Sequence, residues 1–290
     1  SRNNYPPCSV QGFFFAESKN GEKNVMKCAD GVKNMIRPLF ADLYDSLMFS
    51  YFDGIFGNAF CDDTTAPTAA VICCGDFYFA AGDKSFGADM LKFCSDNKNA
   101  VIVPDSEELA KVLCACDGQL KIVKRYHTCP PENDFDTDKL RETLSRVQNM
   151  GQLKLSMIDE ELYKKALAEQ WSESFVCNFK DFADFSAHGF GYVLTDNGRI
   201  VSGTSAFSYY DKGVEIEVST RKEYRLKGLA QITAAAFLLE CVRRGLTPHW
   251  DARNLTSLSI AQKMGFVFRD EYIALELSLI HISEPTRQAE

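Results

Sequence analysis

The stretch TRKEYRLKGLAQI, residues 220–232, lies where a strand-like pattern is followed by a helical one. Before it, residues 214–219 (VEIEVS) alternate apolar and polar side chains, as a half-buried strand does. After it, four apolar residues recur at helical spacing: Leu229, Ile232, Ala236 and Leu239. Cations and a glycine typical of a helix C-terminus follow at Arg243-Arg244-Gly245. The sequence therefore predicts a strand-to-helix junction around Arg225-x-x-Gly228-x-Ala230.

A junction of this kind can bind a phosphate group. Free backbone N–H groups and the positive end of the helix dipole converge at the first turn of a helix. Gly228 and Ala230 carry no bulk that would keep a diphosphate away. A simple turn between a strand and a helix would show the same six-residue pattern, so the residues that follow decide between the two interpretations.

The residues that follow add three more elements. Residues 246–252 (LTPHWDA) read as a strand with Pro248, which cannot donate to a β-ladder and favours a place where neighbouring strands part. Asn254 precedes a short helix predicted over residues 255–264, which ends at Gly265-Phe266. Upstream, Asp196-Asn-Gly198 lies between apolar runs and predicts a hairpin of residues 189–194 and 199–205.

The remaining patterns predict an α/β protein of two domains. Helices are predicted at 26–56 (one or two, interrupted by Pro38), 88–94, 107–113, 139–147, 160–169 and 179–186, and strands at 69–73, 77–80, 100–103, 120–126 and 214–219. The proline-rich stretch 129–134 (CPPEND) shows no periodicity and marks a boundary. We expect an N-terminal α/β domain over residues 26–130 and a second domain over residues 137–276.

Both ends of the chain are expected to lie outside the fold. Residues 277–290 resemble the translation of a transposase adapter from sequencing libraries. The first residue is not Met, and residues 21–25 (GEKNV) resemble a translated ribosome-binding site before Met26, so residues 1–25 are interpreted as a non-native leader. A genuine N-terminal strand around residues 12–15 (GFFF) is the alternative.

The composition limits the partners of the protein. The formal net charge of −8 argues against nucleic acid, which is bound by clustered Lys and Arg, and suits a cationic small substrate better. No apolar stretch approaches the roughly 20 residues of a membrane-spanning helix. The 11 cysteines are scattered and odd in number, without a zinc-type CxxC pair, so we expect free thiols in a reducing compartment. The sequence predicts a cytoplasmic monomer or homodimer that binds neither membrane nor metal.

The predicted elements follow one another in the order strand, phosphate loop, helix, strand, Asn, helix and Gly-Phe. This order resembles that of the GNAT acetyltransferases. The sequence is similar to the two-domain GNAT family that includes zwittermicin-resistance acetyltransferases. This similarity is carried by three segments: VEIEVST (214–220), YRLKGLA (224–230) and PHWDARN (248–254). Shorter phrases, APTA (66–69), GDFYF (75–79) and RY (125–126), extend the resemblance over most of residues 26–276.

The resemblance implies a fold and an activity. The fold is α/β (α+β), with a C-terminal GNAT domain whose mixed, mostly antiparallel sheet is flanked by helices. The smaller N-terminal α/β domain repeats the order hairpin, helix, strand, helix, strand and is interpreted as a degenerate copy. The implied activity is transfer of an acetyl group from acetyl-CoA to the primary amine of a small molecule, with antibiotics among the candidates. The alternative is a non-catalytic acyl-CoA-binding sensor.

The resemblance also implies site residues. In GNAT enzymes a glutamate on the strand before the phosphate loop commonly takes the proton from the amine. Glu217 is the first candidate and Glu215 the second, because strand alternation places both on the face away from the apolar residues. Two solvated charges are the alternative. A backbone N–H near Val218 or Ser219 is expected to polarise the acetyl carbonyl. The predicted cofactor-binding residues are Val218, Ser219, Thr220, Arg225, Leu226, Lys227, Gly228, Leu229, Ala230 and Asn254.

Several polar residues keep more than one interpretation. Asn254 contacts the cofactor or only caps the helix that follows it. Ala261 stands where the family often has a tyrosine as general acid, so Ser257, Tyr272 or water would protonate the thiolate, or it would leave unprotonated. The remaining candidates have no partner at the spacing that a metal site or a Cys–His nucleophile needs: His127, Cys129, His188 and His249.

Overall fold

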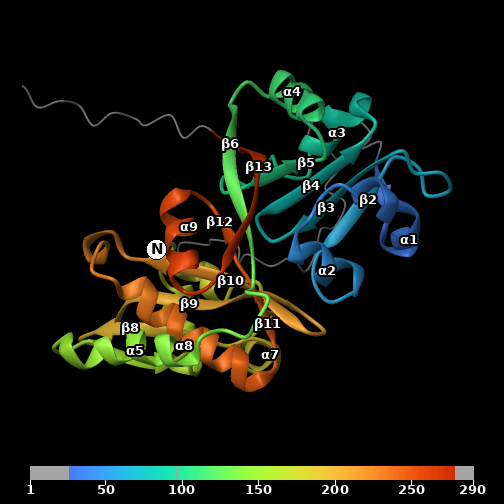
Figure 1. The fold of residues 1–290 in the computed structure, drawn as a ribbon. Coiled ribbons are helices and arrows are strands. Elements are labelled where there is room, and N and C mark those ends of the chain that lie inside the picture. The colour runs from blue at the N-terminus through green and yellow to red at the C-terminus, as the bar shows by residue number, and fades with distance from the viewer. Residues whose placement is uncertain (1–25, 96, 278–290) are drawn as a thin grey trace, which may run out of the picture. The chain divides into compact units, whose positions relative to one another are not determined.

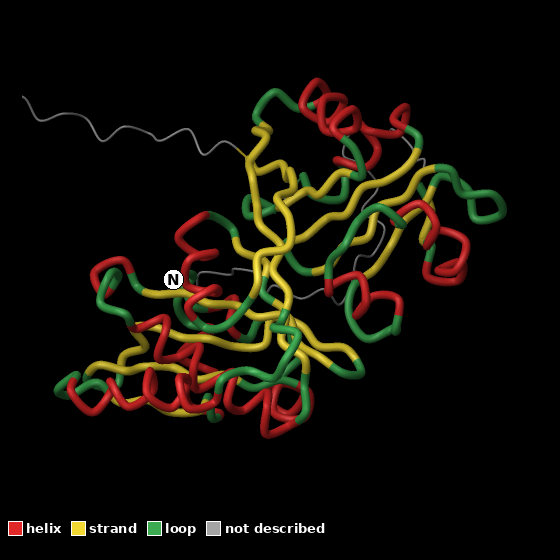
Figure 2. Tube along the Cα trace, viewed as in Figure 1, coloured by secondary structure: helices red, strands yellow, loops and turns green. Residues whose placement is uncertain are grey.

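The computed structural model describes residues 26–95 and 97–277 of the 290-residue chain (Figure 1). The predicted leader, residues 1–25, and residues 278–290 of the predicted tail lie outside the described residues. The chain divides into two compact units, coloured by secondary structure in Figure 2. Unit 1 contains residues 43–58 and 124–272, and unit 2 contains the described parts of 25–42, 59–123 and 273–290. Residues 43–58 therefore group with the C-terminal part of the chain.

Unit 1 is built on a five-stranded sheet in the order β11-β10-β9-β8-β7. Neighbouring strands are antiparallel except β10 and β11, which are parallel, so the predicted mixed, mostly antiparallel sheet is confirmed. The strands are β7 (Lys154–Met157), β8 (Gly191–Asp196), β9 (Arg199–Tyr210), β10 (Gly213–Thr220) and β11 (Thr247–His249). The predicted hairpin joins β8 to β9, with positive φ at Asn197 and Gly198 as a type I′ turn requires.

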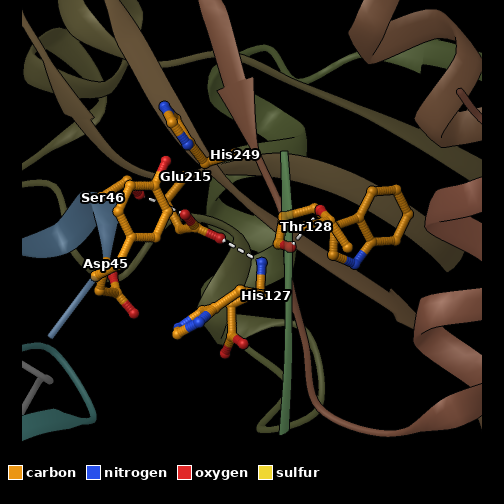
Figure 3. A pocket seen from close by; sticks show the side chains of 9 residues that line it. Asp45, Ser46, His127, Thr128, Glu215 and His249 are labelled. Carbon is orange, nitrogen blue, oxygen red and sulfur yellow. Dashed lines mark hydrogen bonds between the residues drawn. The ribbon is translucent and has the colours of Figure 1, made fainter. Parts of the chain in front are cut away.

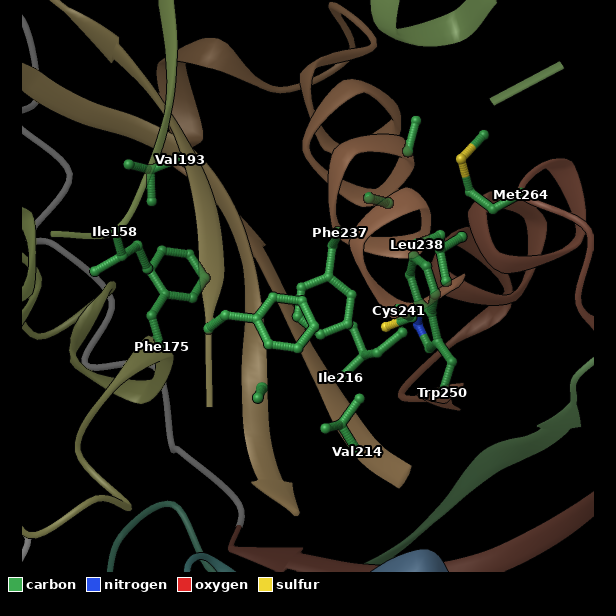
Figure 4. Close-up of a cluster of buried hydrophobic side chains, with 14 of the residues drawn as sticks. Ile158, Phe175, Val193, Val214, Ile216, Phe237, Leu238, Cys241, Trp250 and Met264 are labelled. Carbon is green, nitrogen blue, oxygen red and sulfur yellow. The ribbon is translucent and has the colours of Figure 1, made fainter. Parts of the chain in front are cut away.

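Helices cover the sheet of unit 1. The strand-to-helix junction is confirmed, because β10 is followed by α8 (Leu229–Arg244), which ends at Gly245 in the left-handed conformation. Figure 4 shows Phe237, Leu238 and Cys241 of α8 in one buried cluster with Val214 and Ile216 of β10. Because strand residues alternate, Glu215 faces the other side. The other helices are α2 (Ser46–Phe52), α5 (Thr137–Ser145), α6 (Glu160–Leu167), α7 (Phe182–His188) and α9 (Leu255–Lys263).

The predicted single strand over residues 246–252 is two strands. β11 pairs with β10 only as far as Glu215 and His249. β12 (Asp251–Ala252) instead pairs antiparallel with β6 (Leu120–Cys129). The break is fixed by Thr128, whose hydroxyl donates to the Trp250 carbonyl at 2.8 Å. From residue 216 onward, β10 therefore has β9 on one edge and no longer pairs with β11 on the other.

Unit 2 contains the second predicted hairpin. β3 (Ala69–Cys74) pairs antiparallel with β4 (Phe77–Gly82), and β5 (Val101–Pro104) is parallel to β4. The remaining elements are β1 (Lys27–Cys28), α1 (Lys33–Ile36), β2 (Asn58–Cys61), α3 (Gly87–Leu91), α4 (Glu107–Cys116) and the end of β13 (Val267–Leu277). Leu277, the first residue of the predicted tail, belongs to β13 and packs against the core of this unit. No helix among the described residues is long and apolar enough to cross a membrane.

Unit 2 repeats the pairing order of unit 1. An antiparallel hairpin, a helix and a parallel strand follow one another as β3-β4-α3-β5, as they do in β9-β10-α8-β11. This order supports the hypothesis of a degenerate copy. The junction before α3 differs chemically, because the Gly82 N–H donates to the Asp105 carboxylate at 2.7 Å and Asp83 caps the Ser85 N–H at 2.9 Å. Carboxylates thus take the place that an anion would need.

Candidate active site

Glu215 is a buried carboxyl group at the place where β10 and β11 part. It is 6% exposed and forms the last residue pair of the two strands with His249. Its Oε2 accepts a hydrogen bond from the Ser46 hydroxyl, and its Oε1 accepts the Asp251 backbone N–H at 2.9 Å (Figure 3). Burial raises the pKa of Glu215 to about 7. This carboxyl group can therefore gain and lose a proton near neutral pH.

Asp45 is a second buried carboxyl group in the same pocket. Its Oδ1 caps α2 by accepting the Leu47 N–H at 2.8 Å. Its Oδ2 is buried and has no hydrogen-bond partner in the part of the chain that the structure describes. Burial, together with repulsion from Glu215 and Asp251, raises the pKa of Asp45 well above its ordinary value.

Asp251 is the third carboxyl group and is paired with a buried cation. Arg125 on β6 donates to Asp251 Oδ2 through Nε at 2.9 Å and through Nη2 at 2.5 Å. The same Nε donates to the Tyr272 hydroxyl at 3.1 Å. The side chains of Arg125 and Asp251 are 6% and 9% exposed. Asp251 Oδ1 is buried without a hydrogen-bond partner among the described residues. Only one oxygen of Asp251 is thus satisfied by this ion pair.

Histidine and tyrosine rings complete the walls of the pocket. His249 Nε2 lies 2.7 Å from the Tyr210 hydroxyl, and burial lowers the pKa of His249 to about 4, so its imidazole is neutral at pH 7. His127 stacks on Tyr272 with ring centroids 4.0 Å apart, and its Nδ1 lies 2.7 Å from Asp270 Oδ1. The space between these side chains is about 220 Å³ when the adjoining open solvent is counted, so the enclosed part is much smaller. It admits only a small group.

Glu217, the first candidate from the sequence, lies two residues beyond Glu215 on β10. It is only partly buried, opposite Ser205 of β9, and does not line the pocket. The expectation that both glutamates face away from Val214 and Ile216 agrees with the packing of those two residues in the α8 cluster. The two glutamates differ because the start of α2 covers Glu215.

The N-terminus of α8 begins at a glycine. Gly228 occupies the cap position with φ 77°, and within the described part of the chain no side-chain cap hydrogen bond forms there. The other described helices of seven residues or more all have a capping side chain: Asp45, Ser106, Asp136, Asp159, Asp181 and Asn254. The open end of a 16-residue helix presents N–H donors and a positive dipole end. It therefore suits an anion.

The other predicted cofactor residues form two groups beside this helix end. Val218, Ser219 and Thr220 lie on the part of β10 that β11 does not pair. The loop residues are fixed locally, because Arg225 Nε donates to the Thr220 carbonyl at 3.1 Å and Lys227 Nζ lies 4.8 Å from the Tyr224 ring centroid. Leu226 has φ 62° and is fully exposed, and the two remaining members, Leu229 and Ala230, begin α8.

The structure gives the surroundings of four residues whose roles the sequence left open: Asn254, Ala261, Ser257 and Tyr272. Asn254 caps α9 by accepting the Ser257 N–H at 2.9 Å, and its contact with the cofactor stays a prediction. Ala261 is fully buried in the core of unit 1. The Ser257 hydroxyl accepts the Trp250 indole N–H at 3.1 Å. The Tyr272 hydroxyl is bound by Arg125.

Sequence analysis did not single out Asp45, Ser46, Arg125 or Asp251 as site residues. Asp45 carries a local signal, since an Asp before an apolar helical pattern is an N-cap signature. Ser46 and Glu215, however, are 169 residues apart in the chain. No spacing rule joins residues at that distance.

Comparison with known proteins gives the family. The family model described as GNAT acetyltransferase matches residues 37–275. The chain belongs to this family. It is an N-acetyltransferase with the GNAT fold, and GNAT enzymes generally use acetyl-CoA. The resemblance predicted from the sequence is confirmed.

Relatives of this GNAT acetyltransferase match over most of its length. It is 25% identical over 253 residues to the uncharacterized N-acetyltransferase YdfB of Bacillus subtilis (strain 168), covering 82% of this chain and 92% of that protein. A GCN5-related N-acetyltransferase-like protein from Streptococcus suis 89/1591 is 33% identical, with a TM-score of 0.79, over 84% of this chain and 98% of the other. A glucosamine N-acetyltransferase region in a fungal multi-domain GH3 β-N-acetylglucosaminidase shares the fold alone, with 12% identity, a TM-score of 0.54 and coverage of 87% of this chain and 38% of that chain.

Proposed function

We propose that this GNAT acetyltransferase acetylates the primary amine of a small molecule, with Glu215 as the base. The observation that carries the proposal is the buried carboxyl group of Glu215, whose pKa is raised to about 7 at the end of the β10–β11 pairing. A general base works best when its pKa lies near the working pH. Antibiotics with a primary amine are a candidate acceptor class, which the likeness to zwittermicin-resistance enzymes favours.

Two features of unit 1 fit acetyl-CoA. When bound, acetyl-CoA supplies the acetyl group as a thioester. The backbone N–H groups at the start of α8 would hold its diphosphate, and a Cβ added at Gly228 would meet no atom within 4 Å, so the approach is open. The edge of β10 at Val218 and Ser219 would pair with the pantetheine amides and polarise the carbonyl through a backbone N–H.

Within the pocket, neighbouring groups hold the base in place. The Ser46 hydroxyl and the Asp251 N–H each donate to one oxygen of Glu215, which fixes the carboxyl plane. Glu215 takes the proton from the acceptor ammonium, directly or through a water, and the neutral amine can then attack the carbonyl. His249 stays neutral and so adds no positive charge that would repel the ammonium.

A thiol-release assay with acetyl-CoA and a panel of small amines tests the proposed function. We expect release of CoA that depends on both the enzyme and an amine, and mass spectrometry should find one acetyl group added to the amine. Binding of acetyl-CoA without release in the presence of any amine would contradict the proposal and favour an acyl-CoA sensor.

Ser46→Ala tests whether the hydrogen bond from Ser46 lowers the pKa of Glu215. Removing the hydroxyl takes away a hydrogen bond that favours the charged form of Glu215, so the pKa of Glu215 should rise. A bond to a charged group is worth ~1.5 kcal/mol, which corresponds to about one pH unit. We therefore expect the acid side of the pH profile of kcat/KM to move to higher pH by about that amount.

Ser50→Ala is the matched control for Ser46→Ala. Ser50 is also a buried serine of α2, but its hydroxyl donates to the Tyr209 carbonyl at 2.7 Å and not to Glu215. This variant should lose stability without a shift of the pH profile. Equal profiles for Ser46→Ala and the wild type would show that Ser46 only packs.

A further inference from the structure

We infer that the acceptor is a cationic amine with no anionic group near the reacting nitrogen, held by oxygens of Asp45 and Asp251. The inference rests on the proposed function and adds the class of substrate that the pocket accepts. It follows from the charges in the pocket, the unpartnered oxygens there and the protons that these groups carry.

The ionisable groups that line the pocket are mostly acidic. Three carboxyl groups line it, Asp45, Glu215 and Asp251, while its two histidines have lowered pKa values because they are buried. The buried cation beside them, Arg125, is already bound to Asp251 and Tyr272. At the rim, the Arg269 guanidinium lies 3.4 Å from the Tyr44 ring centroid and is paired with Asp270 at 3.5 Å, so these two charges offset each other.

Two oxygens of these carboxyl groups lack a hydrogen-bond donor within the described residues. Asp45 Oδ2 and Asp251 Oδ1 are buried and have no hydrogen-bond partner among the described residues. Asp45 is 4% exposed, and it lines the pocket together with Glu215 (Figure 3). Buried carboxyl oxygens are nearly always hydrogen-bonded in native proteins, so these two indicate a ligand that brings its own donors. An alkylammonium group brings three N–H donors and the charge that the carboxylates need.

The protons of the cluster support the same conclusion. Burial and mutual repulsion raise the pKa values of Asp45 and Glu215, so part of their charge is neutralised by protons when no cation is near. A bound ammonium favours the ionised carboxylates and should displace those protons. A carboxylate or phosphate next to the amine would instead be placed against three acidic groups, at a cost that its own ammonium cannot offset.

The test uses acceptor pairs that differ in charge. Phenylalaninamide and phenylalanine have nearly the same volume, and only phenylalanine is anionic beside its amine. Putrescine and ornithine differ by the carboxylate of ornithine. For the wild-type enzyme we expect kcat/KM to be roughly tenfold or more higher for phenylalaninamide than for phenylalanine, and for putrescine than for ornithine. The α-amine of phenylalaninamide is less basic than that of phenylalanine, whereas putrescine is as basic as ornithine. A preference for the uncharged-substituent compound in both pairs is therefore not explained by amine basicity.

Asp45→Asn assigns the effect to the pocket. Asn keeps the shape and the helix cap of Asp45 but removes its charge, so the preference for phenylalaninamide over phenylalanine should shrink by several-fold. Asp211→Asn is the control, because Asp211 is an exposed residue in the turn between β9 and β10. The control should keep the wild-type preference.

Each outcome decides between the two proposals. Equal or higher kcat/KM for phenylalanine and ornithine would overturn the inference while amine acetylation itself stands. If neither member of a pair is acetylated, calorimetry on the same four compounds decides. Binding of phenylalaninamide and putrescine alone, with proton release in buffers of different ionisation enthalpy, would uphold the class of amine that the pocket binds. The thiol-release assay with the wider amine panel then tests the proposed function separately. Binding of none of the four would overturn the inference as well.

Discussion

Glu215→Gln is expected to lower kcat at pH 7 by about 10²-fold or more, the usual scale of general-base catalysis. Gln keeps the shape of the side chain and can still accept the Asp251 N–H, but it cannot take a proton from the amine. The affinity for acetyl-CoA, measured by calorimetry, should barely change, because the residues proposed to bind it lie on the edge of β10 and at the start of α8.

The pH profile provides a second readout of the same variant. Because the pKa of Glu215 is raised to about 7, wild-type activity should fall as the pH drops below about 7, where the carboxyl group becomes protonated. Glu215→Gln should lose this titration and recover much of its rate at alkaline pH, where the amine is already neutral.

Glu217→Gln is the control on the same strand and should stay close to wild type. If Glu217→Gln lost activity and Glu215→Gln kept it, the two roles would be exchanged. If both variants remained active at pH 7, the carboxyl groups would only bind the substrate, and the enzyme would act by positioning alone.

Gly228→Asp is expected to abolish measurable binding of acetyl-CoA. The carboxylate would lie at the open N-terminus of α8 and would both occupy the anion site and repel a diphosphate. The fold should be retained, because an added Cβ meets no atom within 4 Å and Asp tolerates the left-handed conformation better than most residues. Calorimetry gives the affinity, and circular dichroism checks the fold.

Gly228→Asn separates charge from shape. Asn has the size of Asp and an equal tolerance of positive φ, but it carries no charge. We expect a partial loss of affinity for Gly228→Asn and a complete loss for Gly228→Asp. Unchanged affinity in both variants would refute the assignment of residues 225–230 as the diphosphate site.

Local sequence patterns predicted the elements whose bounds depend only on their own residues. The β8–β9 turn followed from Asp196-Asn-Gly198, and α8 followed from its apolar stripe and Gly245. The division of residues 246–252 into β11 and β12 was not predicted, because it depends on β6 pairing with Asp251 from more than 100 residues away. β7 and β13 were also missed, and most of their side chains are only partly buried or exposed, so their apolar alternation is weak.

Local patterns were likewise not enough to predict the candidate site. Alternation in residues 214–219 correctly places two glutamates on one strand but cannot rank them. What distinguishes Glu215 is the cover that Asp45 and Ser46 provide, together with the N–H of Asp251. Burial and pKa depend on these long-range neighbours, whereas the phosphate loop is a continuous segment and carries its chemistry in its own residues.

The grouping of residues 43–58 with the C-terminal part of the chain has a consequence for synthesis on the ribosome. Ser46 is translated 169 residues before Glu215, an interval of roughly 10 to 30 s at ~5–20 residues per second. During that time Leu47, Met48 and Tyr51 of α2, which are buried in the finished protein, have no completed β9–β10 hairpin to pack against. The contacts of α2 with β9 and β10 can therefore form only late in synthesis, and we expect the apolar residues of this segment to stay without their final partners until then.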